Sequence, residues 1–192
     1  MKLHIFNPEH DIALAANQER FTAPHAGRRL RTDLGFIPAF WASEGDMVLV
    51  DDVEAAIEAR RHLSKFGKDV VFVTYADLKA FAFEDVESFQ VDPWGWDRTI
   101  KEQLLRANSN LQSFMPSDDT LAAIREMSSR RFAAEHLLPL LREAGEEKTI
   151  GEAHYCTTME KVKLTMAQNV KSVLESPWSS SGRGVRYVET AA

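Results

Sequence analysis

Short apolar runs alternate with helix-like segments through the first half of the chain. Residues 1–6, 47–50 and 70–73 are β-rich runs of the length that is typical of strands. Each run is followed by residues that favour a helix, and Asp11 is placed to cap the first of these helices. Strands that alternate with helices indicate a parallel sheet with helical crossover connections. The first half is therefore predicted to be an α/β lobe with a small, Rossmann-like parallel sheet.

The pattern changes near residue 115, where a proline, a serine and two aspartates interrupt the apolar periodicity. We expect a boundary here that divides the chain into lobes of residues 1–117 and 118–192. Helical spacing and capping residues then predict two consecutive helices, of which the second begins near Ser129. The remaining elements are expected to be a short strand at 153–156, a helix begun by a threonine cap, a strand at 170–175 and a final strand at 184–188 that completes a C-terminal β-hairpin.

Composition and charge exclude several classes of protein. The 192 residues are 44% apolar and 27% charged, which is the average of globular domains. A net charge of -6 with scattered basic residues lacks the basic face of a nucleic-acid binder. No apolar run approaches the roughly 18 residues of a membrane span, and no signal peptide precedes the first strand. We therefore expect a cytoplasmic protein that binds neither nucleic acid nor membrane.

Cysteine and histidine usage bears on metal and disulfide chemistry. The single cysteine, Cys156, excludes an intramolecular disulfide and suits a reducing compartment. The spacings of the histidines match no familiar pattern of metal ligands. No metal site is predicted within the chain.

A loop rich in serine and glycine joins the last two predicted strands. It offers three hydroxyl donors, two positions that can adopt a positive φ and one arginine. Backbone N–H groups in such a loop can converge on an anion, and a guanidinium can pair with two phosphate oxygens. The same composition also suits an ordinary exposed turn. The residues considered for phosphate binding are Ser179, Ser180, Ser181, Gly182, Arg183 and Gly184.

The order of elements after residue 118, together with the stretch from Val173 to Val188, resembles the first part of an ATP-grasp domain. The α/β first half is similar to the smaller, pre-ATP-grasp lobe of that family. The resemblance implies an ATP-dependent ligase that joins a small carboxylate substrate to an amine or thiol, with ATP and magnesium as cofactors. It also implies that the hairpin closes over the nucleotide phosphates. Arg130 or Arg131 matches a second family cation near the start of the preceding helix, or else these arginines lie on a solvated helix face.

Two departures from the family affect this hypothesis. Glu175 stands where the family has a lysine, and a carboxylate at that position repels phosphate. The family holds magnesium with side chains further along than the hairpin, whereas this sequence ends at Ala192. The chain is accordingly expected to be a truncated ligase, inactive alone. The alternative hypothesis is a non-enzymatic α/β module that binds a ligand or a protein, and the unpaired hairpin edge also suits pairing with a second copy.

Glu9, His10 and Asp11 follow the first predicted strand and form the second candidate site. Ligands of open α/β sheets gather at the carboxyl ends of the strands, so these residues are expected to contact a substrate. The alternative is a simple turn in which Asp11 only caps a helix. Two tryptophans at residues 93–97 suit either the stacking of a base or sugar, or anchoring of the core.

Overall fold

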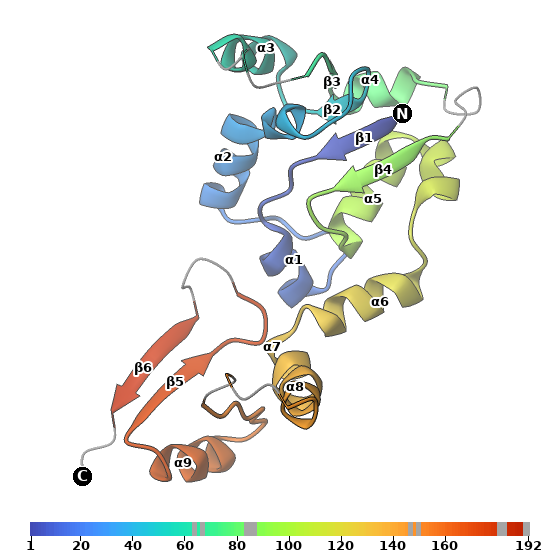
Figure 1. Ribbon diagram of the computed structural model, residues 1–192. Coiled ribbons are helices and arrows are strands. Elements are labelled where there is room, and N and C mark those ends of the chain that lie inside the picture. The colour runs from blue at the N-terminus through green and yellow to red at the C-terminus, as the bar shows by residue number, and fades with distance from the viewer. Residues whose placement is uncertain are drawn as a thin grey trace. The chain divides into compact units, whose positions relative to one another are not determined.

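The computed structural model describes residues 1–62, 65, 68–82, 88–145, 148, 151–179 and 184–189 (Figure 1). These residues form two compact units, Met1–Leu121 (unit 1) and Ala122–Ala192 (unit 2). The division falls inside helix α6 (Asp118–Met127), near the boundary that the sequence places at residue 117.

Unit 1 is built on a four-stranded parallel sheet. The strands lie in the order β3, β2, β1, β4, and every neighbouring pair is parallel, which confirms the predicted parallel α/β arrangement. The sequence did not predict β4, a short edge strand with alternating polar residues. The strand bounds are Lys2–Ile5 for β1, Met47–Leu49 for β2, Val71–Val73 for β3 and Gln90–Pro93 for β4.

Helices follow each strand of unit 1, as the sequence predicts. Two of them begin at capping side chains, since Thr74 forms a capping box with Asp77 and Asp97 accepts a hydrogen bond from the N–H of Ile100. The bounds are His10–Ala16 for α1, His25–Leu34 for α2, Ile37–Phe40 for the 3₁₀ helix η1, Val53–His62 for α3, Tyr75–Ala80 for α4, Arg98–Ala107 for α5 and Ser109–Phe114 for the 3₁₀ helix η3.

The predicted cap at Asp11 is wrong. The turn at Asn7 starts the helix earlier, because the N–H of His10 donates to the carbonyl of Asn7, and α1 has no side-chain cap. Asp11 instead lies in the first turn of α1, where a negative charge favours the positive end of the helix dipole.

Side chains alternate across the sheet and build a core on each face. Leu3 and Ile5 of β1 pack with Leu104 of α5 on one face. Val48 of β2 packs with Ala39 of η1 and other residues on the opposite face. Helices therefore cover both faces, which is the arrangement that a parallel sheet needs (Figure 1).

Unit 2 consists of helices and an antiparallel hairpin (Figure 1). The predicted hairpin is confirmed, with Leu174 of β5 opposite Arg186 of β6. Ser129 and Thr158 cap helices as expected. The bounds are Arg130–Phe132 for α7, Ala133–Leu137 for the π-helical turn η4, Leu138–Glu143 for α8, Met159–Ala167 for α9, Lys171–Glu175 for β5 and Val185–Glu189 for β6.

The predicted strand at residues 153–156 is wrong, because these residues belong to no helix or strand. A strand needs a hydrogen-bonding neighbour, and the strands that the structure describes in unit 2 pair only with each other. Cys156 of this segment is a free, partly exposed thiol rather than a buried strand residue.

Unit 2 differs from unit 1 in its core. The buried apolar side chains among the described residues all lie at or before Leu121. Val173 and Leu174 of β5 and Tyr187 of β6 are instead exposed. Among the described residues, no helix is both long and apolar enough to cross a membrane.

Candidate functional site

One group of polar side chains in unit 1 gathers where the parallel strands end. Glu9 and His10 follow β1, Asp51 follows β2, Tyr75 follows β3 and Asp97 follows β4. The strand order places β2 and β3 on one side of β1 and β4 on the other, so the order in which strands are added across the sheet reverses between β1 and β4. Ligands of open α/β sheets bind at such a reversal, beyond the carboxyl ends of the strands.

Asp97 is the centre of a buried hydrogen-bond network at this reversal. Its residue is only 4% exposed. His10 Nδ1 donates to Asp97 Oδ2 at 3.0 Å, and Asn7 Nδ2 donates to the same oxygen at 3.4 Å. A carboxylate can only accept, so the ring nitrogen Nδ1 carries the proton of this bond. Asp97 thereby fixes the orientation of the His10 ring.

Gly95 is needed for the close approach of His10. A Cβ atom at residue 95 would lie 2.3 Å from Cδ2 and 2.4 Å from Nε2 of the His10 ring. The backbone of Gly95 also exchanges two hydrogen bonds with the side chain of Asn7, at 2.8 and 3.2 Å. The absence of a side chain at Gly95 therefore allows the segment after β4 to pack against Asn7 and His10, which follow β1.

Glu9 and Arg31 form a buried ion pair beside this network. Arg31 Nη1 donates to Glu9 Oε1 at 2.7 Å, and Glu9 is 8% exposed. Burial raises the pKa of Glu9, Arg31 opposes that shift, and the negative charges of Asp97 and Asp51 add to it. Glu9 Oε2 and Arg31 Nε are buried and make no hydrogen bond within the described part of the chain. The pair thus has both an acceptor and a donor that remain unused.

Tyr75 and Asp51 complete the cluster. The Tyr75 hydroxyl donates to Gln103 Oε1 at 3.0 Å, and burial raises the pKa of this phenol to about 12. Asp51 accepts a 2.6 Å hydrogen bond from the Thr32 hydroxyl. The phenol is held neutral near physiological pH, and it stands among Glu9, Asp51 and Asp97, the carboxylates that follow the other three strands.

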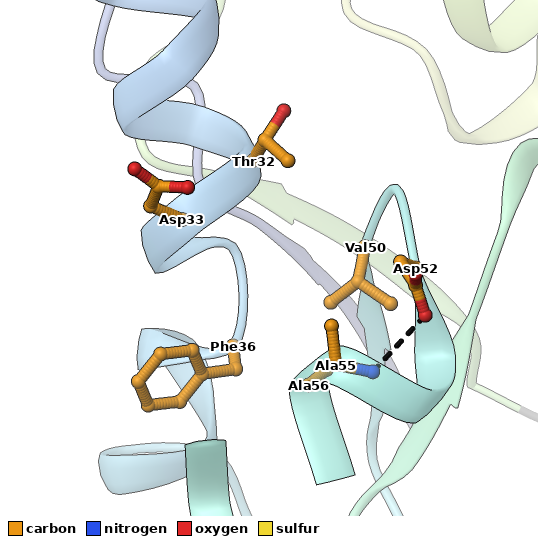
Figure 2. A pocket seen from close by; sticks show the side chains of 7 residues that line it. All are labelled: Thr32, Asp33, Phe36, Val50, Asp52, Ala55 and Ala56. Carbon is orange, nitrogen blue, oxygen red and sulfur yellow. Dashed lines mark hydrogen bonds between the residues drawn. The ribbon is translucent and has the colours of Figure 1, made fainter. Parts of the chain in front are cut away.

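A shallow pocket of about 250 Å³ adjoins this cluster through Thr32. Figure 2 shows it between α2 and the first turn of α3, which begins where Asp52 accepts a hydrogen bond from the N–H of Ala55. Its charged lining residues, Asp33 and Asp52, are both carboxylates, so this pocket is unsuited to phosphate. The remaining lining residues are Thr32, Phe36, Val50, Ala55 and Ala56.

The structure brings two of the three predicted substrate-binding residues into the cluster. Glu9 and His10 make the contacts described above. Asp11 takes no part in these hydrogen bonds and lies in the first turn of α1. Among the described residues, no group of three or more histidine, cysteine, aspartate or glutamate side chains is arranged to hold a metal ion.

The predicted phosphate loop lies only partly within the described residues. Ser180, Ser181, Gly182 and Arg183 fall outside them. Gly184 adopts a φ of 74°, the left-handed conformation that glycine takes without strain. The Ser179 hydroxyl is buried and makes no hydrogen bond to the described residues.

Arg130 is bound to the segment that leads from β5 into this loop. Its guanidinium donates to the carbonyls of Ser176 and Ser179 at 2.9 and 3.2 Å. Its Nε lies 3.3 Å from Glu175 Oε1 in a half-exposed ion pair. Nearby, the indole of Trp178 donates to the carbonyl of Arg125, whose guanidinium lies 3.8 Å from the ring centre. Helices α6 and α7 thus hold the base of the hairpin.

Reasoning from sequence did not single out Arg31, Tyr75 and Asp97 as site residues. Tyr75 follows the apolar run at residues 70–73 by two positions, which is a signal that could have found it. Asp97 follows β4, a strand that the sequence did not predict, so it carried no such signal. Arg31 carries no such signal, because it reaches Glu9 from a helix 22 residues further along the chain.

Comparison with protein-family models, with curated proteins and with solved structures finds no match for this chain.

Proposed function

We propose that this chain is the N-terminal portion of an ATP-dependent carboxylate ligase of the ATP-grasp type. In this proposal unit 1 is the small α/β lobe that contacts a substrate, and the hairpin of unit 2 covers the phosphates of ATP. Support comes from the element order, which runs from a parallel α/β lobe through capped helices to an antiparallel hairpin.

The observation that carries the nucleotide part is the position of Arg130. It places a guanidinium at the base of the Ser/Gly loop, where it fixes the backbone through the carbonyls of Ser176 and Ser179. Phosphate binding by a loop requires its N–H groups to be aligned in advance, and a braced base favours that alignment. The charge of Glu175 partly neutralises Arg130, so we expect weak affinity for ATP.

The substrate part rests on the cluster at the carboxyl ends of β1 and β4. His10 is oriented by Asp97, and Glu9 and Arg31 offer an unused acceptor and donor. A small molecule with both polar donors and acceptors would satisfy these groups. The cluster therefore suits a substrate better than it suits a purely structural role.

Calorimetry with magnesium-ATP tests the nucleotide part. Glu175→Lys restores the cation of the family position, and we expect it to tighten ATP binding at least about tenfold, which corresponds to about 1.4 kcal/mol. Glu189→Lys is the matched control, since it makes the same charge change on the hairpin at the opposite end from the loop, where Glu189 pairs with Lys171. Absence of ATP binding to all three proteins would refute the proposal.

A second candidate is a non-enzymatic module that binds a small ligand in unit 1 alone. The pairing of Arg130 with Glu175 favours it, because the charges of these two side chains offset each other at the base of the loop. This function predicts that small amines or carboxylates raise the melting temperature without ATP. The shift should disappear in Glu9→Gln but persist in Glu19→Gln, the same substitution at an exposed position of unit 1. A ligand effect that requires ATP would favour the ligase.

A further inference from the structure

Two exposed tryptophans stand at the edge of unit 1 where β1 and β4 end. Trp94 directly follows β4 and is 62% exposed, and Trp41 directly follows η1 and is 50% exposed. An exposed tryptophan is costly because the indole is large and apolar, and two adjacent ones mark a surface that contacts something. Neither belongs to the polar cluster around Asp97.

The two indoles are held at a fixed angle. Their ring centroids lie 6.2 Å apart and their planes make an angle of 53°, so the faces diverge instead of stacking. Phe6 meets the Trp94 ring edge to face, with centroids 5.8 Å apart. The backbone N–H of Trp94 donates to the carbonyl of Ile5 at 2.7 Å. The indole faces are thus positioned before any ligand arrives.

These tryptophans line a pocket of about 270 Å³. The other lining residues are Ile5, Asp92 and Pro93, so the one charged group in the lining is a carboxylate. Asp92 Oδ2 lies 3.1 Å from Nδ1 of His4 and 3.9 Å from Nζ of Lys2, and the Asp92 side chain remains about half exposed at 47%. The pocket therefore combines two aromatic faces with an accessible negative charge.

We propose that the Trp41–Trp94 pocket binds a small organic cation, an alkylammonium or quaternary ammonium group. The face of an aromatic ring is negative, tryptophan attracts cations most strongly of the aromatic side chains, and a carboxylate adds to that attraction. The pocket is smaller than the sites that hold drug-sized ligands, which suits a compact head group. A nucleobase sandwiched between the two indoles would need parallel faces, and the 53° angle does not supply them.

Choline and its neutral isostere 3,3-dimethyl-1-butanol distinguish the contribution of charge. The two molecules have nearly the same shape, and only choline is charged. We expect calorimetry of the full chain to give saturable choline binding that is at least about tenfold tighter than binding of the alcohol. Equal affinity for the two molecules, or no saturable binding of choline, overturns the proposal.

Three variants assign the binding to this pocket. Trp94→Leu keeps an apolar side chain but removes the aromatic face, and we expect choline affinity to fall about tenfold or more. Trp178→Leu is the matched control, because Trp178 lies in unit 2, and it should leave choline binding unchanged. Asp92→Asn should weaken choline binding severalfold with no effect on the alcohol. Circular dichroism checks that Trp94→Leu is folded, and unchanged choline affinity in that folded variant contradicts the assignment.

Discussion

Replacement of Gly95 by alanine should destabilise unit 1 by breaking the contact between His10 and Asp97. The added Cβ would lie 2.3 to 2.5 Å from three atoms of the imidazole, well inside van der Waals contact. Gly95 is not among the glycines with positive φ, so alanine can adopt its backbone conformation. The whole effect should therefore come from displacement of the His10 ring.

The magnitude follows from the bond that is lost. A hydrogen bond to a charged group contributes about 1.5 to 3 kcal/mol, and Asp97 is buried, so water replaces the lost bond poorly. We expect Gly95→Ala to lower the free energy of unfolding by about 2 kcal/mol. In a His10→Ala background the obstructing ring is absent, and the same substitution should cost less than about 0.5 kcal/mol.

Urea denaturation followed by tryptophan fluorescence measures both values. A Trp178→Phe background leaves the remaining tryptophans, at residues 41, 94 and 96, in unit 1, so the signal reports that unit alone. Gly27→Ala is the control, because its Cβ would meet only ordinary contacts, 3.5 Å from Cβ of Glu9, inside helix α2. That variant should gain about 0.5 to 1 kcal/mol. An equal cost of Gly95→Ala with and without His10 would refute the role assigned to the glycine.

Three further predictions concern titration and assembly. Burial raises the pKa of Glu9, so the folded protein holds the proton of the Glu9 carboxyl more tightly than the unfolded chain does. The free energy of unfolding should therefore fall as the pH rises from 4.5 through the raised pKa of the folded state. Urea titrations at several pH values should show that Glu9→Gln removes this decline. With a pKa of about 12, Tyr75 should stay neutral, so wild type and Tyr75→Phe should give equal tyrosinate absorbance up to about pH 11. We propose that the hairpin edge pairs with a second copy of the chain, so light scattering should detect dimers. Tyr187→Lys, at a position that is 83% exposed, should reduce the dimer fraction. A monomer at all protein concentrations contradicts this proposal.

The amino-acid sequence by itself determined the local elements of this protein. Apolar runs at residues 47–50 and 70–73 form strands because short β-branched and aliphatic runs pack well in a buried parallel sheet. Helices begin at Ser129 and Thr158 because their hydroxyls satisfy free N–H groups of the first turn. These features depend on neighbours a few residues apart, which a sequence displays directly.

Elements that depend on partners were predicted less well. The strand β4 is a polar edge strand that exists because β1 pairs with it, and the expected strand at 153–156 has no such partner. Burial of Ala13 and Leu14 in α1, the helix that follows β1, also depends on tertiary contacts.

In the candidate site, too, local features were predictable from sequence and contacts between distant residues were not. The sequence placed Glu9 and His10 at a strand end, which local pattern can establish. Only the tertiary structure decided that Asp97 would orient His10 and that Arg31 would pair with Glu9, because these partners lie 87 and 22 residues away. The parallel register of β1 and β4 brings their carboxyl ends together, and no pattern within either segment specifies which side chains then meet.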